Sequence, residues 1–357
     1  MTPRLLVHLH PAPDRDMVNP YLSMLVAGLR SEGVEVVELG TREFDDTSVV
    51  HVHWPEMPLN AAKLQWTLRR LKNLFAALVS ARRRGVPVVW TVHNLRAHDG
   101  RRPALQRLLW QVFPRLVDGW ISLSRSGIEP TEAAFPALRR KPRAVVAHGT
   151  YAGVIGHPDG AAARSGLGLP QDARVLGLVG RIKPYKGVED LVDAVTASTD
   201  EDLRLVVGGG CDDAALRSRL EAVAALDPRI TLLLERLPQE RVDAVLAACD
   251  LAVLPFRAVF NSGSVLLCLS AGRPVLAPRT PVFTELAEQV GPGWLTTFDG
   301  ELTTAVLEDA LRRLPRAGAP DLSAHEWPAV AAAHVEFYER LRHRAEHTTD
   351  QFSGGTR

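Results

Sequence analysis

Short apolar runs alternate with longer segments of helical periodicity along most of the chain. In the first half, the short runs predict strands at "RLLVHLH", "VEVVELG", "SVVHVHW", "VPVVWTVHN", "GWISLS" and "RAVVAHG". Amphipathic helices are predicted between them at "PYLSMLVAGLRSEG", "NAAKLQWTLRRLKNLFAALVSARRRG" and "ALQRLLWQVFPRLV". Because strands that alternate with helices form parallel sheets with crossover helices, this half predicts an α/β domain.

The alternation stops in a segment rich in Gly, Ala and Pro, Gly149 to Ala173, which is interpreted as a linker. It restarts at "RVLGLVG" and continues through five strands and the helices between them. The pattern therefore predicts two Rossmann-like domains, whose ligands sit outside the carboxyl ends of the strands. The predicted divisions are a first domain over 1–160, a second over 170–322, a terminal helix over 323–344 and a disordered tail over 345–357.

Composition narrows the class of protein. The formal net charge is +1, which does not suggest a nucleic-acid partner. The three cysteines have no CxxC spacing, which argues against a disulfide framework or structural zinc and favours a reducing cytoplasm. No apolar run is long enough to span a membrane, and proline breaks the N-terminal run too early for a signal peptide. We therefore expect a cytoplasmic protein.

Two cations follow the first predicted strand of the second half, in "GRIKPYKGVEDLVDAV". Arg181 and Lys186 lie just past the strand and just before a helix. Fixed cations beside a helix N-terminus form a seat for a diphosphate, because the side chains and the helix dipole both attract negative charge. Taken alone, the same pattern is equally typical of a solvated loop.

Two further strand ends in this half carry small residues. One reads Asn261-Ser262-Gly263-Ser264 and leads into an apolar helix, so that backbone N–H groups and hydroxyls can approach an anion, although an ordinary N-cap favours the same residues. The other contains Gly209 and suits close approach of a base or ribose, or a plain turn. The chain has no GxGxxG or GxxxxGKS/T motif, so the pattern differs from that of dinucleotide and P-loop sites.

The stretches "GRIKPYKGVEDLVDAV", "LRLVVGGG", "ACDLAVLPF" and "LSAGRPVLAP" resemble the nucleotide-sugar-binding half of GT-B glycosyltransferases of the family-4-like group. The resemblance covers essentially the whole chain and is stronger in the second half. It implies that Arg181 and Lys186 hold the donor diphosphate and that Arg236 and Leu237 lie near the base. It also implies that the first domain binds the acceptor and that the terminal helix, "EWPAVAAAHVEFYERL", crosses back onto it.

One departure from the family pattern concerns the mechanism. Retaining members carry two glutamates around the small-residue loop, whereas this chain has no acid between Asp250 and Glu285. The "SGS" and "GRPV" pattern, the "HWPE" run and Asn19-Pro20-Tyr21 resemble instead a group of inverting exopolysaccharide β-1,4-mannosyltransferases. An inverting transfer requires a base on the acceptor side to deprotonate the attacking hydroxyl.

Candidates for that base lie on strand-end loops of the first domain. Asp14 and Asp16 follow the first strand, and Glu56 follows "VVHVHWP", beyond a proline that frees it from the strand ladder. Strand parity places His51 and His53 on one face, with His51 as a satisfied core histidine. A metal site would need further ligands at defined spacing, so no metal is expected.

Other residues near this loop have two interpretations each. Tyr21, His53 and Trp54 are predicted to line an acceptor pocket, although for Trp54 core packing is the favoured interpretation. His93, in "TVHN", corresponds in the resemblance to a histidine that contacts the donor sugar, and it also fits a strand-end histidine bonded to backbone. His98 and Asp99 follow in the same loop.

From Met57 to His98 the sequence contains no acid but eight bases. The helix predicted over 61–84 is therefore either a crossover helix with one solvated face or a surface that contacts an anionic membrane.

Together these features predict a metal-independent hexosyltransferase without a cofactor. Its donor is a nucleoside diphosphate sugar of the mannose or glucose type, and its acceptor is a glycan, a lipid-linked glycan or a small molecule. The transfer is expected to invert the anomeric centre. The alternatives are a retaining family-4-like transferase and a nucleotide-sugar-binding protein without transfer activity.

Overall fold

The computed structural model describes residues 5–12, 20–95 and 102–353, with side chains up to residue 345. The chain separates into two compact units. Unit 1 comprises Met1–Gly149 and Ser323–Arg357, and unit 2 comprises Thr150–Leu322. Each unit contains one six-stranded sheet in which every pair of neighbouring strands is parallel.

The sheet of unit 1 has the strand order β2-β1-β3-β4-β5-β6. Its strands are β1 (Leu6–His10), β2 (Glu35–Glu38), β3 (Ser48–Val52), β4 (Val88–Val92), β5 (Gly119–Ser122) and β6 (Arg143–Val145). Its helices are α1 (Tyr21–Ser31), η1 (Met57–Asn60), α2 (Leu64–Arg83), α3 (Pro103–Leu116), α4 (Ile128–Ala134), η2 (Pro136–Leu138), η4 (Ser323–His325) and α12 (Trp327–Ser353).

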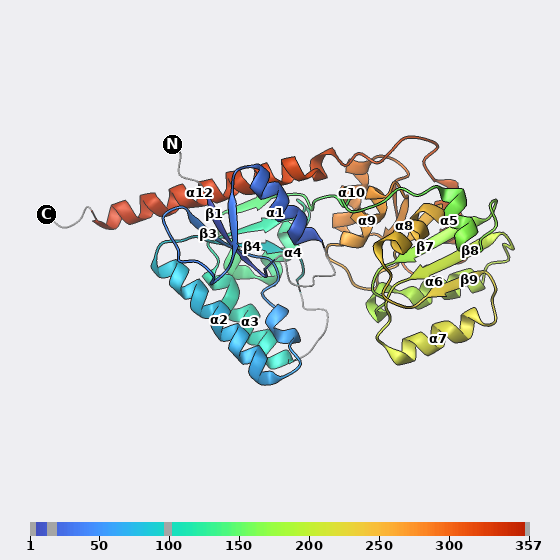
Figure 1. Ribbon diagram of the computed structural model, residues 1–357, viewed down its shortest axis with the longest axis horizontal. Coiled ribbons are helices and arrows are strands. Elements are labelled where there is room, and N and C mark those ends of the chain that lie inside the picture. Colours follow the sequence, from blue (N-terminus) through green and yellow to red (C-terminus); the bar gives the residue numbers. More distant parts are fainter. Residues whose placement is uncertain (1–4, 13–19, 96–101, 354–357) are drawn as a thin grey trace. The chain divides into compact units, whose positions relative to one another are not determined.

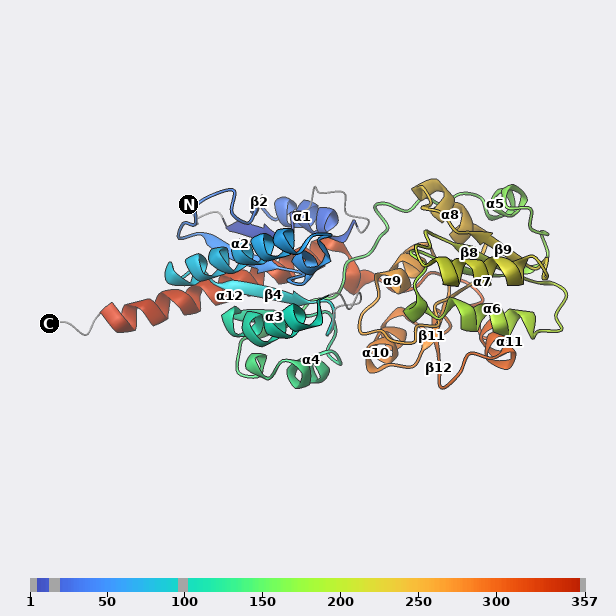
Figure 2. The ribbon, with the colours of Figure 1, turned by 90° about the horizontal axis from the view of Figure 1, so that it is seen from below.

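Helices cover both faces of this sheet, which explains why the inner strands β1, β3, β4 and β5 are buried along almost their whole length. Helices α1 and α12 lie on one face, and α2 and α3 lie on the other (Figures 1 and 2). Strand parity decides which core each residue joins. Val49 and Val89 pack in the core under α1 and α12, whereas Trp90 contacts Phe113 of α3.

Helix α12 returns the end of the chain to the first unit. Its buried residues Val330, His334, Phe337, Tyr338 and Leu341 recur at helical spacing and form one face of the helix. Close packing requires small partners on the sheet side. A Cβ on Gly119 would lie 2.6 Å from a methyl carbon of Leu341, and one on Gly149 would lie 2.4 Å from the indole of Trp327.

The sheet of unit 2 has the order β12-β11-β10-β7-β8-β9. Its strands are β7 (Arg174–Val179), β8 (Leu203–Gly208), β9 (Ile230–Leu233), β10 (Leu251–Val253), β11 (Val275–Pro278) and β12 (Leu295–Phe298). Its helices are α5 (Gly160–Gly166), η3 (Pro184–Lys186), α6 (Val188–Thr196), α7 (Ala214–Ala224), α8 (Gln239–Ala248), α9 (Gly263–Ser270), α10 (Pro281–Val290) and α11 (Thr304–Arg312).

Each sheet has a topological switch point, where successive connections leave in opposite directions and their loops diverge. In unit 1 it lies between β1 and β3, and in unit 2 between β7 and β10. The space outside the carboxyl ends of the strands at a switch point is the usual ligand site of such sheets. The relevant loops are therefore those that follow His10, Val52, Val179 and Val253.

The α/β architecture expected from the sequence is confirmed, including the return of the terminal helix, but the predictions for the linker and the tail were wrong, and helix α4 was not predicted. The segment interpreted as a linker contains α5, which Asp159 caps by accepting a hydrogen bond from the N–H of Ala162. Strand β12 was not predicted. The tail expected to be disordered from residue 345 continues as α12 to Ser353.

Candidate functional site

Lys186 is the buried cation of the switch point in unit 2. It lies in η3, directly before Gly187 and α6, and only 6% of its surface is exposed. Its Nζ donates a hydrogen bond of 3.4 Å to Oγ of Ser264, in the first turn of α9, which follows the neighbouring strand-end loop. Burial lowers the pKa of Lys186 to about 8. A desolvated ammonium gains more from an incoming anion than a solvated one does.

Arg181 occupies the same loop but is differently placed. Its side chain is 61% exposed and forms an ion pair of 3.2 Å with Asp212, in the loop after β8. An exposed pair of this kind contributes little to stability, so Arg181 is readily available to a diphosphate.

The second strand-end loop supplies the start of α9. Ser262 is the N-cap residue of that helix, yet its side chain makes no capping hydrogen bond. Helix α9 therefore begins without the side-chain acceptor that an N-cap serine usually provides. Asn261, Ser262, Gly263 and Ser264 are all partly exposed. This arrangement leaves hydroxyl and N–H donors at the edge where Lys186 lies.

Glycines allow the strand-end loops to approach each other closely. Gly187 has φ 66°, and a Cβ there would lie 2.0 Å from the carbonyl oxygen of Pro255. Gly209 has φ 144°, and a Cβ there would lie 2.1 Å from the carbonyl oxygen of Gly180. Gly209 is thus required by contact with the loop after β7, whether or not it also approaches a ligand.

Arg236 and Leu237 lie beside the same group of loops, between β9 and α8. Arg236 is exposed, and its backbone nitrogen would lie 3.7 Å from a Cβ on Gly210. Leu237 is partly buried, and its Cδ1 would lie 2.8 Å from a Cβ on Gly208. The loop that the resemblance places near the base therefore borders the glycine-rich end of β8.

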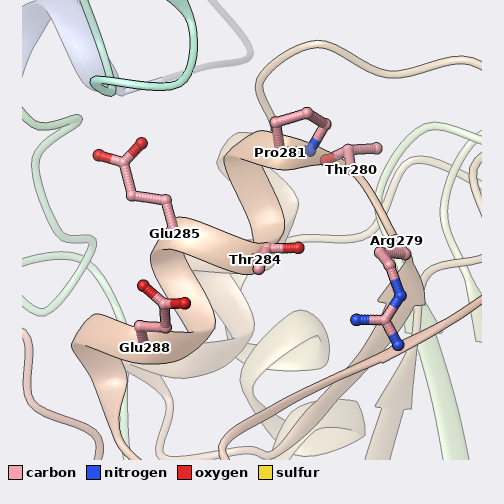
Figure 3. Close-up of a pocket in the computed structure, with 6 residues that line it drawn as sticks. All are labelled: Arg279, Thr280, Pro281, Thr284, Glu285 and Glu288. Atoms are coloured by element: carbon pink, nitrogen blue, oxygen red, sulfur yellow. The ribbon is translucent and has the colours of Figure 1, made fainter.

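An open pocket of about 480 Å³ lies further along this edge, where β11 leads into α10. Its lining residues are Arg279, Thr280, Pro281, Thr284, Glu285 and Glu288. Figure 3 shows Thr284 between the two glutamates and Arg279. Arg279 is paired with Asp299 at 2.9 Å. No sequence pattern predicted this pocket, whose carboxylates can accept hydrogen bonds from hydroxyl groups.

The switch point of unit 1 carries a buried network of histidines. Nδ1 of His53 and Nε2 of His93 lie 2.9 Å apart. His51 is bonded at both ring nitrogens, to the hydroxyl of Thr91 at 2.8 Å and to that of Tyr338 at 2.6 Å. The rings of His51 and His53 lie 4.1 Å apart on one face of β3, which confirms the predicted parity and the core role of His51.

Burial keeps this network neutral. Desolvation lowers the pKa of His51, His53 and His93 well below that of a free imidazole, and lowers that of His148 and His334 to about 4. Neighbouring histidines add to the effect, because two imidazolium ions would repel each other. Within the described part of the chain, no group of three or more His, Cys, Asp or Glu side chains is arranged to hold a metal ion.

Aromatic side chains enclose the histidines. Tyr21 is fully buried and packs against the rings of His53, His93 and His148 at centroid distances of 4.5–5.6 Å. Trp54 is partly exposed and stacks on His93 at 4.5 Å. Tyr21 and His53 therefore form the interior wall of this strand end. The exposed part of Trp54 is the surface that an acceptor could reach.

Glu56 begins η1, directly after the histidine-rich strand end. Its side chain is partly buried, and desolvation raises its pKa to about 7. A carboxyl group with this pKa is suited to act as a general base, because about half of it is ionised at pH 7 and its carboxylate is more basic than an ordinary one. Asp14 and Asp16, the other candidate bases, lie outside the described residues, as do Asn19, His98 and Asp99.

Two sets of residues were missed by sequence reasoning. His148, His334 and Tyr338 join the histidine network from distant segments, and no local pattern signals them. Arg257 links the two donor-side loops. Two sequence features could have predicted this contact: the acidic pair Glu189-Asp190 at the start of a helix, and an arginine shortly after a strand end.

Comparison with known proteins gives the family of the chain. Residues 173–314 match the family model described as "Glycosyl transferases group 1". The "GDP-mannose:glycolipid 4-beta-D-mannosyltransferase" of Xanthomonas campestris pv. campestris is 33% identical over 94% of this chain and 92% of its own length.

Two solved structures share the fold. The structure of Anabaena Alr3699/HepE in complex with UDP-glucose has a TM-score of 0.60 at 16% identity, over 97% of this chain and 99% of its own. That of WaaG, a glycosyltransferase of lipopolysaccharide biosynthesis, has a TM-score of 0.58 at 14% identity, over 98% of this chain and all of its own. The chain therefore belongs to the group 1 glycosyltransferases, with the GT-B fold, and is a hexosyltransferase.

Proposed function

We propose that the protein transfers a hexose of the mannose type from a nucleoside diphosphate sugar to a hydroxyl group of a glycolipid. The observation that carries this proposal is the buried ammonium of Lys186, 3.4 Å from Ser264 at the switch point of unit 2. The donor binds at that edge, and the acceptor binds at the corresponding edge of unit 1.

The donor-side residues supply charge stabilisation. As the glycosidic bond to the donor breaks, negative charge develops on the departing diphosphate. Lys186 and Arg181 neutralise it, while Ser264 and the first N–H groups of α9 donate hydrogen bonds. Protein cations thereby take the role that a divalent metal plays in other transferases, so we propose that neither a metal nor a cofactor is required.

On the acceptor side, Glu56 is the proposed base, with Asp14 and Asp16 as its competitors. The attacking hydroxyl must lose its proton while it forms a bond to the anomeric carbon. A single displacement by that hydroxyl inverts the anomeric centre. The lack of any acid between Asp250 and Glu285 favours inversion, because it removes the carboxylates that the resemblance associates with retention.

The relative from Xanthomonas supports the choice of substrates. Its printed name specifies GDP-mannose, a glycolipid acceptor and a β-1,4 linkage, and the identity extends over nearly the whole of both chains. We therefore propose GDP-mannose as donor and a lipid-linked saccharide as acceptor. The glycan and small-molecule acceptors that the sequence left open become alternatives.

A lipid-linked acceptor implies a membrane surface, and we propose that α2 and α3 contact it. Within the described residues, most large exposed apolar side chains lie on these two helices: Leu64, Trp66, Leu68, Val79, Leu108 and Val112. Neither helix contains an acid, and no described ion pair involves Lys63, Arg70, Lys72 or Arg83. Exposed apolar side chains and cations on the same helices suit an anionic interface. No described helix is long and apolar enough to cross a bilayer.

The decisive experiment incubates the protein with GDP-mannose and a lipid-linked oligosaccharide, and determines the anomeric configuration of the product by NMR. A β-mannosyl product supports the proposal. An α-mannosyl product identifies a retaining enzyme and excludes a simple displacement. Donor binding without transfer to any acceptor of a panel identifies a binding protein.

Membrane contact is tested by co-sedimentation with vesicles containing anionic phospholipid. The double variant Lys72→Glu/Arg83→Glu should bind much less than wild type. The control Arg241→Glu/Arg316→Glu changes two exposed positions of unit 2 without a described ion pair and should bind as wild type. Arg82 is not a suitable position, because it pairs with Asp118 at 2.6 Å and its reversal would also break that ion pair. Equal binding of all three proteins contradicts the proposed contact.

A further inference from the structure

Arg257 connects the two loops that form the proposed donor site. It follows β10, and its guanidinium reaches the first turn of α6, which follows the loop after β7. Its Nε and Nη2 donate to the two carboxylate oxygens of Asp190 at 2.9 and 2.6 Å. Its Nη1 donates to Glu189 at 3.2 Å. This bidentate geometry is the most directional form of an ion pair.

The backbone makes the same connection. The N–H of Arg257 donates to the carbonyl oxygen of Tyr185 at 2.8 Å, within the turn that carries Lys186. One residue beyond Lys186, Gly187 packs against the carbonyl of Pro255 so closely that a Cβ would not fit. The main chain of the Pro255–Arg257 segment therefore contacts the Tyr185–Gly187 turn, and the Arg257 side chain holds the start of α6 that directly follows it.

A simpler interpretation is that Glu189 and Asp190 are favourable only because acids stabilise a helix N-terminus. That interpretation does not require an arginine from another strand to satisfy both carboxylates. It also leaves unexplained why Glu189 has a second arginine partner, Arg219 of α7, at 2.6 Å. The side chain of Glu189 is only 12% exposed, whereas those of Arg257 and Asp190 are 44% and 37% exposed, so the network is anchored on one largely enclosed carboxylate.

Arg257 is not placed to bind the donor diphosphate itself. Its three guanidinium nitrogens already donate to Glu189 and Asp190, whereas Arg181 has a single ion pair, with an exposed aspartate. An arginine held by two carboxylates has little net charge to offer a further anion. Its effect on the donor is therefore expected to pass through Lys186.

We infer that Arg257 is a positioning residue of the donor site, which fixes the Tyr185–Gly187 turn so that Lys186 stays buried against Ser264 at the carboxyl end of β7. This inference rests on the proposed donor site. Without the Arg257 contacts the turn would move away from the loop that precedes α9. Water would then reach Lys186, and the donor would meet a mobile, solvated ammonium.

The environment of Lys186 provides a readout that does not need the donor. The ammonium faces the hydroxyl of Ser264 and, among the described residues, one titratable group, the thiol of Cys268 on α9. Burial raises the pKa of that thiol to about 12. That thiol stays neutral between pH 7 and pH 10, so a change in the pKa of Lys186 in this range reports a change in the hydration of its ammonium. An acylating reagent labels the neutral amine of Lys186. The labelling rate, followed by mass spectrometry from pH 7 to pH 10, measures the pKa and the accessibility of that amine.

The test compares wild type with Arg257→Gln and with Arg174→Gln. Arg174 pairs with Asp200 at the opposite, amino end of β7 and controls for the loss of an ion pair in the same sheet. In Arg257→Gln we expect the midpoint of the labelling profile to rise above about 8 and the limiting rate to increase several-fold. We also expect donor affinity to fall about tenfold. Arg257→Lys should recover part of both effects, and Arg174→Gln should show neither.

Each outcome separates the inference from the proposed function. Unchanged labelling of Lys186 in Arg257→Gln overturns the inference, as does changed labelling with unchanged donor affinity. Equal effects of Arg174→Gln and Arg257→Gln reduce Arg257 to a general stabilising role and also overturn it. If labelling changes in Arg257→Gln but wild type binds no nucleoside diphosphate sugar, Arg257 positions Lys186 as inferred, whereas the proposed donor site is refuted.

Discussion

The hydroxyl of Tyr338 lies 2.6 Å from Nδ1 of His51, so a side chain from the last helix completes the hydrogen bonding of a histidine in the central region of the first sheet. Both residues are fully buried. The bond joins α12 to β3 and leaves both nitrogens of His51 satisfied, since Thr91 occupies the other.

Tyr338→Phe should destabilise unit 1 by about 1–2 kcal/mol, because it removes the hydrogen bond and leaves a buried ring nitrogen without a partner. The free energy of unfolding in urea measures the change. Glu339→Gln, the exposed neighbour on α12, is the control and should unfold as wild type does. A Tyr338→Phe variant as stable as wild type would show that the bond contributes nothing.

The neutral histidine network makes stability depend on pH. In the unfolded chain these histidines bind protons below about pH 6.5, whereas in the folded unit the pKa of His148 and His334 is about 4 and that of His51, His53 and His93 is also strongly lowered. The unfolded state therefore binds more protons than the folded state below pH 6.5. The free energy of unfolding is unaffected by these histidines above pH 6.5 and decreases as the pH falls towards 4.

Each such histidine contributes a slope of about 1.4 kcal/mol per pH unit in that window. Unfolding in urea at a series of pH values measures the total slope. His334→Gln should reduce it by about one histidine's share. The surface variant His343→Gln, on the same helix, should leave the slope unchanged. A slope that neither variant alters would mean that other groups govern the acid transition.

The acid limb of the transfer rate should report Glu56. Its carboxylate is the active form, so kcat/KM should rise with pH through about 7, the pKa of Glu56. Glu56→Gln should lower kcat by about 10²–10⁴ and remove this limb. Asp14→Asn and Asp16→Asn, measured beside it, decide between the three candidates. If Glu56→Gln keeps full activity while an aspartate variant loses it, the base is that aspartate.

Gly187→Ala should disrupt the donor-side turn. The backbone there has φ 66°, which costs an L-residue about 1–2 kcal/mol, and the new Cβ would collide with the carbonyl of Pro255. We expect a lower melting temperature of unit 2 and weaker donor binding. Gly166→Ala is the matched control, because its Cβ would meet nothing within 4 Å. Normal stability and donor affinity in Gly187→Ala would contradict the close contact.

The sheets could be predicted from the sequence because apolar runs and helical periodicity follow each other regularly. Helix α5 was not predicted because "GAAARSG" has no apolar stripe, and its only sequence signal is the capping residue Asp159. Strand β12 was not predicted because its four residues, between Gly- and Asp-containing turns, are too few to show an alternation of apolar and polar positions.

The candidate site could be predicted only as far as strand ends locate it. Position after a strand identified Lys186, Glu56 and Ser264, because parallel strands bring their carboxyl ends to one edge. The burial of Lys186 depends on the packing of two loops that are far apart in the sequence. The partners of His51 and Asp190, which are Tyr338 and Arg257, likewise depend on tertiary packing and not on local pattern.

Calorimetric titration of GDP-mannose into wild type and Lys186→Met tests the donor site most directly, with Arg312→Met on α11 as the control. Wild type and control should bind alike. Their affinity should decrease as the pH rises through about 8, because the diphosphate needs the protonated amine. Lys186→Met should bind at least tenfold more weakly, a loss of about 1.4 kcal/mol, without this pH dependence. Equal affinity of wild type and Lys186→Met at pH 7 would contradict the assignment of the donor site.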